Sequence, residues 1–189
     1  TAIKLMTQCH QIKAQPAELS PKAIVTGLIN ESPFSSQQQK ELLQMAEQLT
    51  SQLSHHSKMV CCHGDLNFSN ILIDHQKNSW LIDFECASTA PAEFDLAMFV
   101  AVNNITKENI STVIELYKQH SFTTIDHQLV NAYLLFCYFI NGLWYFNATQ
   151  QLPINNKREL KALAQQQWQY FDELSKSHHK TIKLLNPWL

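Results

Sequence analysis

Residues 62–73 read CHGDLNFSNILI, and residues 80–85 read WLIDFE. Both stretches contain short runs of β-branched and aromatic residues, which are typical of strands. The residues between them, 74–79, are polar and suit a turn that joins two antiparallel strands. We therefore predict strands over residues 59–62, 70–73 and 80–84, with the last two paired as a hairpin.

This hairpin would bring oxygen-bearing side chains together at one end. If Asn70 opens the first strand and Asp83 closes the second, their side chains lie at the same end, where Asp65 also emerges. Mg²⁺ prefers hard oxygen ligands, and a nearby carboxylate can take the proton of an attacking hydroxyl. Singly, Asp65 would be read as a turn residue and Asn70 as a cap, but their joint pattern favours a site for phosphoryl transfer.

The sequence on either side of the hairpin is mainly helical. Residues 1–12 predict a short helix, and Pro16 and Pro21 then indicate a connector. Residues 36–53 predict an amphipathic helix whose capping box is Ser36 with Gln39. Further helices are expected over residues 93–102, 107–119, 126–149 and 156–177. The predicted fold class is α+β and mainly helical, in one folding unit with a small β-hairpin.

Composition restricts the partners that we expect. The 189 residues carry a formal net charge of -2 and no basic run, which argues against a nucleic-acid partner and favours a small molecule. The five cysteines include no C-x-x-C spacing, which argues against a disulfide framework and a zinc site. A reducing cytoplasm is therefore the expected location.

The one candidate for membrane insertion is the apolar segment 129–146. Its Asn131 and Asn141, together with several aromatic residues, favour a buried helix instead of a membrane span. We see no signal peptide at the start of the chain. No membrane insertion is expected.

Three motifs in order carry a family resemblance: His63-Gly64-Asp65 with Asn70, Ile82-Asp83-Phe84-Glu85, and Phe94-Asp95-Leu96. In this spacing they resemble the aminoglycoside phosphotransferase and choline/ethanolamine kinase family, over about residues 1–146 and most sharply over 62–99. The resemblance implies the C-terminal lobe of a protein-kinase-like fold. It also implies transfer of the γ-phosphoryl of ATP to a metabolite hydroxyl, of choline/ethanolamine, thiamine or amino-sugar type, with Mg²⁺ as cofactor.

The resemblance also implies a role for each motif residue. Asp65 would be the catalytic base, and Asn70 and Asp83 would bind Mg²⁺. His63 would support the loop, and Asp95 would be a buried anchor that holds the loop by hydrogen bonds.

A possible substrate pocket is implied by Glu85 and by two residues of the aromatic segment. Glu85 could touch either metal or substrate. Gly142-Leu143-Trp144 resembles a choline-kinase motif whose Trp contributes to an aromatic cage for a quaternary ammonium, an arrangement that cation–π attraction explains. Asn141 stands where a second cage Trp is expected, which puts choline itself in doubt.

The family's nucleotide-covering parts have no counterpart here. No Gly-rich loop, and no strand Lys with a helix Glu, precedes the motifs in this sequence. We therefore expect residues 1–189 to be the C-terminal lobe alone, with the N-terminal ATP-covering lobe absent from this chain. The alternatives are a fragment of a kinase and a catalytically inactive binding or regulatory module that lacks this lobe.

Overall fold

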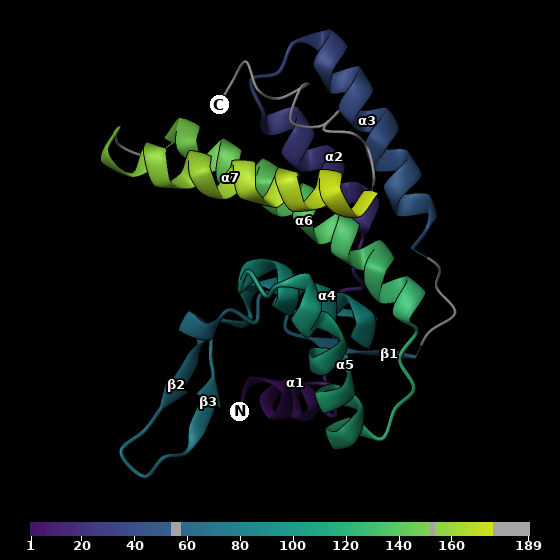
Figure 1. Cartoon of the computed structure of the whole chain (residues 1–189), viewed down its shortest axis with the longest axis vertical. Coiled ribbons are helices and arrows are strands. Elements are labelled where there is room, and N and C mark those ends of the chain that lie inside the picture. Colours follow the sequence, from purple (N-terminus) through teal and green to yellow (C-terminus); the bar gives the residue numbers. More distant parts are fainter. Residues whose placement is uncertain (54–57, 152–153, 176–189) are drawn as a thin grey trace. The chain divides into compact units, whose positions relative to one another are not determined.

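The computed structural model describes residues 1–53, 58–151 and 154–175 (Figure 1). They form two compact units, the first made of residues 1–19 and 54–134 and the second of residues 20–53 and 135–189. The described chain is mainly helical with two small sheets, which confirms the predicted α+β class.

The first unit combines several α-helices and the start of a further one, α6 (His127–Gln151), with two antiparallel strand pairs. The helices that lie wholly in it include α1 (Ala2–Cys9), α4 (Ala92–Val102) and α5 (Lys107–Ser121). β1 (Met59–Cys62) pairs with β4 (Ser88–Pro91), and β2 (Ile71–Ile73) pairs with β3 (Ser79–Leu81). Helix α4 is buried along nearly its whole length, so even its acidic residues Glu93 and Asp95 lie inside the unit.

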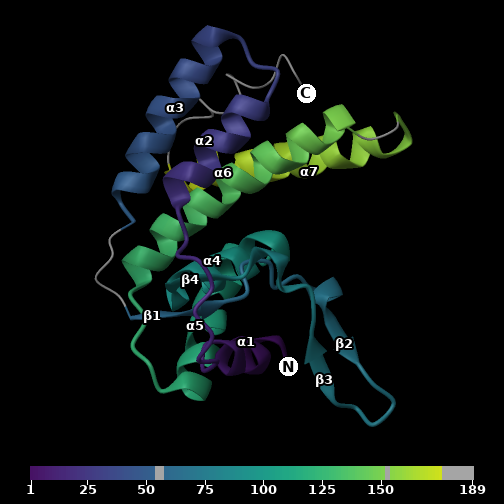
Figure 2. The ribbon, with the colours of Figure 1, turned by 180° about the vertical axis from the view of Figure 1, so that it is seen from behind.

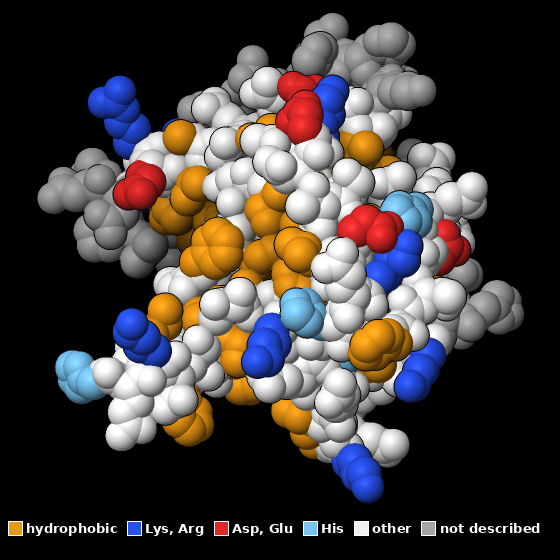
Figure 3. Space-filling model, turned by 60° about the horizontal axis from the view of Figure 1, so that its bottom comes forward, with side chains coloured by type: hydrophobic (Ala, Val, Ile, Leu, Met, Phe, Trp, Pro, Cys, Tyr) orange, Lys and Arg blue, Asp and Glu red, His pale blue; other side chains and the backbone are white. Residues whose placement is uncertain are grey.

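The predicted hairpin is confirmed, with Ile71 opposite Leu81 and Leu72 opposite Trp80. Figures 1 and 2 show it projecting from the rest of the first unit. Several of its apolar side chains are exposed, including Leu72, Ile73 and Trp80. The face shown in Figure 3 accordingly presents apolar side chains among polar ones.

The second unit is built from helices. Helix α2 (Pro21–Glu31) packs against α3 (Ser36–Ser51), and the later part of α6 (His127–Gln151) runs beside α7 (Ile154–Ser175) (Figure 1). Trp168 is completely buried, and its indole N–H donates to the carbonyl oxygen of Phe139 at 3.4 Å. Gly142 lies against the Trp168 indole so closely that a Cβ there would overlap the ring.

Two local expectations were wrong, and one strand was missed. The connector after Pro16 contains helix α2, which begins with Pro21 at its first turn, a position that suits the fixed φ of proline. The capping box of α3 is one residue earlier than expected, formed by Ser35 and Gln38. Strand β4 was not predicted at all. The last two residues of the expected helix 156–177 lie outside the described residues.

Helix α6 contains the segment considered for membrane insertion. Within the described residues it is the one helix long and apolar enough to cross a membrane, and 67% of its most apolar window is buried. A core helix of a globular protein has the same properties.

Candidate functional site

The loop after β1 is held by a buried carboxylate. Asp95 in α4 is fully buried, and its Oδ2 accepts a hydrogen bond from the backbone N–H of His63 at 2.8 Å. Its Oδ1 accepts one from the N–H of Gly64, also at 2.8 Å. Hydrogen bonds to an ionised acceptor are among the stronger ones in proteins, so these two fix the backbone just before Asp65.

Gly64 allows the loop to approach a neighbouring segment. Its φ of +80° is in the region that favours glycine. A Cβ at this position would also overlap the backbone carbonyl of Cys86. The loop therefore needs glycine at residue 64 for two independent reasons.

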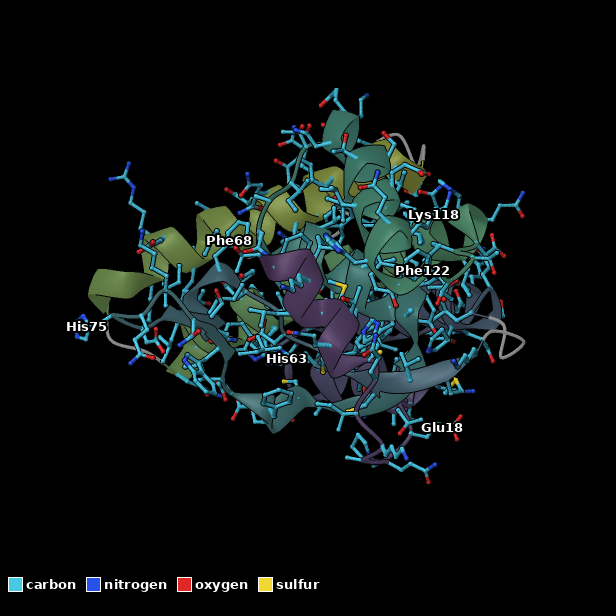
Figure 4. All side chains as sticks on the ribbon, turned by 90° about the horizontal axis from the view of Figure 1, so that it is seen from below. Glu18, His63, Phe68, His75, Lys118 and Phe122 are labelled. Carbon is cyan, nitrogen blue, oxygen red and sulfur yellow. The ribbon has the colours of Figure 1, made fainter. Side chains whose placement is uncertain are left out.

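The His63 side chain connects the loop to the end of the hairpin. Its Nε2 lies 2.9 Å from the carbonyl oxygen of Ile82, and its Nδ1 accepts from the N–H of Asp65 at 3.2 Å. Together these contacts assign the ring proton to Nε2. The ring also meets Phe84 edge to face, with centroids 4.7 Å apart. Figure 4 labels His63, and His75 in the hairpin turn lies well away from it.

Asp65 and Asn70 are in direct contact. Asn70 ends the 3-10 helix η1 (Phe68–Asn70) and is 9% exposed. Its Nδ2 donates to the backbone oxygen of Asp65 at 2.9 Å and to the Asp65 carboxylate at 3.2 Å. Its Oδ1 accepts no hydrogen bond from the described residues, which leaves this hard oxygen free for another ligand.

Asp83 follows the hairpin strand in an unusual backbone conformation. The N–H of Ile82 donates to the carbonyl oxygen of Asn70 at 3.0 Å, which places Asp83 one residue beyond Asn70 on the facing strand. Asp83 has a φ of +66° and begins the 3-10 helix η2 (Phe84–Cys86). A non-glycine residue in the left-handed region is often found at functional sites. Its carboxylate is exposed and forms no hydrogen bond with the described residues.

Negative charge accumulates around Cys86. Burial raises the pKa of the Cys86 thiol, and the carboxylates of Asp65, Glu85 and Asp83 raise it further. The three carboxylates therefore lie close enough to act on one thiol. A concentration of carboxylate oxygens beside a free amide oxygen is a donor set that fits Mg²⁺.

The predicted pocket residues fall in different units. Glu85 is exposed in η2 of the first unit, beside the carboxylates. Asn141 and Trp144 are on α6 in the second unit. Trp144 is 57% exposed and meets Tyr145 edge to face.

Sequence reasoning missed three residues that support the loop. The Asn103 side chain accepts from the N–H of Phe68 at 2.9 Å and donates to the carbonyl oxygen of Leu66 at 3.0 Å. The ring of His10 lies between Tyr117 and Asp95, within hydrogen-bond distance of both. None of the three residues belongs to a motif. The one available signal was that His10 and Asn103 are polar residues that directly follow an apolar helical stripe.

Similarity to known proteins agrees with this geometry. The model of the APH phosphotransferase enzyme family matches residues 14–130. Comparison with curated proteins found no match.

Among solved structures, choline kinase LicA from Streptococcus pneumoniae matches with a TM-score of 0.65 and 17% identity, covering 87% of this chain and 60% of that one. A choline/ethanolamine kinase family protein from Mesorhizobium loti matches with a TM-score of 0.69 and 16% identity, covering 97% and 62%.

Spectinomycin phosphotransferase APH(9)-Ia, solved with ADP and spectinomycin, matches with a TM-score of 0.55 and 20% identity, covering 91% and 59%. The chain thus spans about 60% of the length of these structures. At such identities the likeness concerns the fold, which is that of a kinase-like lobe.

The family match covers more than half of the chain, including the loop, the hairpin and the Asp95 anchor. The chain belongs to the APH phosphotransferase enzyme family.

Proposed function

We propose that the protein is an ATP-dependent phosphotransferase that acts on a hydroxyl of a small metabolite. The observation that carries this proposal is the contact of Asp65 with Asn70, which the strand carrying Asp83 faces through the hydrogen bond from Ile82 to Asn70. Family membership supports the same reaction class.

In this mechanism Asp65 is the catalytic base. The acceptor oxygen attacks the γ-phosphorus of ATP, the bond from that phosphorus to the β-phosphate oxygen breaks, and ADP leaves. The hydroxyl proton passes to the Asp65 carboxylate. Asn70 holds this carboxylate through its 3.2 Å hydrogen bond, so the base keeps one orientation.

Asn70 and Asp83 are the residues that would hold Mg²⁺. The ion would neutralise charge on the phosphates of ATP. The Oδ1 of Asn70 and the Asp83 carboxylate, neither of which accepts a hydrogen bond within the described part of the chain, would supply oxygen ligands for it. Glu85 is proposed to contribute to metal or acceptor binding.

The acceptor is proposed to be a hydroxyl compound of choline, ethanolamine, thiamine or amino-sugar type. Structural neighbours are named as choline kinases and as a spectinomycin phosphotransferase. The exposed face of Trp144 would suit a cationic acceptor through cation–π attraction, and Asn141 would add a polar contact.

The test is an ADP-release assay on the full-length gene product with Mg²⁺-ATP and these four kinds of acceptor, with mass spectrometry of the product. We expect transfer to at least one of them. Asp65→Asn should lower turnover by about 10²–10⁴-fold, the usual contribution of a general base.

The matched control is Asp74→Asn, which removes a carboxylate from the turn of the same hairpin, at the end away from Asp65. Its turnover should stay near that of the parent protein. Equal turnover of Asp65→Asn and parent would reject the base. Binding of Mg²⁺-ATP without transfer to any acceptor would instead support an inactive, regulatory module.

A further inference from the structure

His10, immediately after α1, contacts both α4 and α5. Its Nδ1 lies 2.7 Å from the Tyr117 hydroxyl oxygen, and its Nε2 lies 2.9 Å from Oδ2 of Asp95. The side chains of His10 and Asp95 are 4% and 0% exposed. Tyr117 is also buried.

The chemistry of the three groups sets the direction of the hydrogen bonds. An ionised carboxylate only accepts, so Nε2 of His10 carries the proton shared with Asp95. In the neutral imidazole, Nδ1 is then an acceptor, and the Tyr117 hydroxyl donates to it. With the neutral ring, the donors therefore run from the Tyr117 hydroxyl to His10 and from His10 to Asp95.

Asp95 is also the carboxylate that holds the loop. Its Oδ2 accepts from His63 as well as from His10, and its Oδ1 accepts from Gly64. A buried carboxylate needs such partners, and loss of one leaves charge uncompensated in a place without water. The imidazole therefore fixes the orientation of the carboxylate that fixes the loop.

We propose that His10, itself held by Tyr117, is a positioning residue that orients Asp95 and, through it, the backbone that carries Asp65. The effect on turnover rests on the function proposed above. The effect on the loop does not.

A metal ion is the competing explanation for this cluster. The ligating atoms of His10, Cys62 and Asp95 all lie within 4.8 Å of one another. Tetrahedral zinc with bonds of about 2.0–2.1 Å would separate its ligand atoms by roughly 3.3 Å. The 2.9 Å between His10 and Asp95 is instead a hydrogen-bond distance, and the Cys62 thiol is directed at the carbonyl oxygens of Ala90 and Pro91, at 3.6 and 3.5 Å.

The first experiment is amide hydrogen exchange of this chain by NMR, without nucleotide or acceptor. His10→Leu should speed exchange at the His63 and Gly64 amides by about tenfold or more relative to the amides of β1, because the carboxylate that accepts from them loses its third partner. Unchanged exchange at both amides would overturn the proposal.

Two polar substitutions keep the test decisive if His10→Leu does not fold. Gln can place its amide nitrogen near the Nε2 position and donate to Asp95, whereas Asn is too short and reaches only the Nδ1 position. His10→Gln should therefore restore slow exchange, and His10→Asn should not. Equal exchange in the two variants would contradict the assigned role.

Tyr117→Phe removes only the hydroxyl that holds the ring, so a smaller acceleration at the same two amides is expected. Tyr138→Phe is its control, because Tyr138 is a buried tyrosine of α6 outside the first unit. It should leave exchange at the His63 and Gly64 amides unchanged.

Addition of Zn²⁺ to the parent chain should not slow exchange at the His63 and Gly64 amides. A stoichiometric slowing by zinc that is lost in Cys62→Ala would favour the metal explanation and overturn the proposal.

The second experiment measures turnover of the full-length gene product. His10→Asn should lower kcat by about 10- to 100-fold with little change in KM, as expected for a misplaced base, and His10→Gln should recover most of it. Full turnover in His10→Asn, beside an inactive Asp65→Asn, would overturn the proposed effect on catalysis. An active Asp65→Asn would instead reject the proposed function and leave the exchange result standing.

Discussion

Gly64 combines a left-handed backbone with a close contact to the Cys86 carbonyl. Gly64→Ala should therefore destabilise the protein by about 1–3 kcal/mol, the usual range for a strained backbone position. Urea unfolding followed by circular dichroism measures this difference.

Gly27→Ala is a control for which the expected change in stability has the opposite sign. It lies inside α2, and an added Cβ would have nothing within 4 Å. Gly27→Ala should stabilise the protein by about 0.5–1 kcal/mol, because alanine loses less backbone entropy in a helix. An alanine at residue 64 that is tolerated as well as one at residue 27 would contradict the described contact.

The contacts of individual residues were predictable where a motif is local in sequence. Asp65 and Asn70 are separated by a few residues, and one tight loop brings them together. His10 reaches Asp95 across 85 positions, and such a contact depends on how α1 packs on the rest of the unit. Patterns of neighbouring residues hold no information about that packing.

At the scale of the helix, α3 shows how two adjacent serines differ. Ser35 accepts from the Gln38 N–H, and the Gln38 side chain accepts from the Ser35 N–H. Ser35→Ala should cost about 1 kcal/mol in the free energy of unfolding, whereas Ser36→Ala, at the first helical position, should change it by less than about 0.5 kcal/mol. Thermal unfolding of the two variants measures this difference. A larger loss of stability in Ser36→Ala than in Ser35→Ala would instead support the capping box at Ser36 that the sequence predicted.

The β2–β3 hairpin should respond to acid. Hydrogen bonds from the side chains of Asn78 and Trp80 lower the pKa of Asp74 below its ordinary value of 3.8. Because the folded pKa is lowered, these bonds stabilise the turn above pH 3.8 and are lost as the pH falls through the lower, folded value.

The indole N–H signal of Trp80, which donates to Asp74 at 3.1 Å, should shift in NMR spectra over that acid range. The Trp168 indole donates to a carbonyl oxygen and is its internal control. A Trp80 signal that does not move more than that of Trp168 would contradict the contact.

The elements that sequence reasoning missed share a physical cause. Helix α2 contains Gly27 and several β-branched residues, which weaken its intrinsic helix propensity. Strand β4 includes Pro91 and small side chains, and it exists because β1 provides a pairing partner. In both, tertiary contacts decide the structure. The helices with a strong apolar periodicity and the β2–β3 hairpin could be predicted from local sequence alone.

At the scale of the whole molecule, α6 bears on whether the protein is recovered in the supernatant or with the membranes after cell lysis. Its most apolar window is mostly buried within the described chain. After cell lysis and ultracentrifugation we expect the protein in the supernatant without detergent. Recovery only from detergent-treated membranes would show that this helix has a different partner.

The fold class could be predicted because the motifs fix the connectivity around the loop and hairpin, and the helices follow from apolar periodicity. The division into two units could not, because it depends on which helix packs on which.

That division has a practical consequence for dissecting the protein. The chain passes from the first unit to the second after residue 19, returns after residue 53 and leaves again after residue 134. No single truncation can separate the units. A gene for the first alone would have to join residue 19 to residue 54, and one for the second would have to join residue 53 to residue 135.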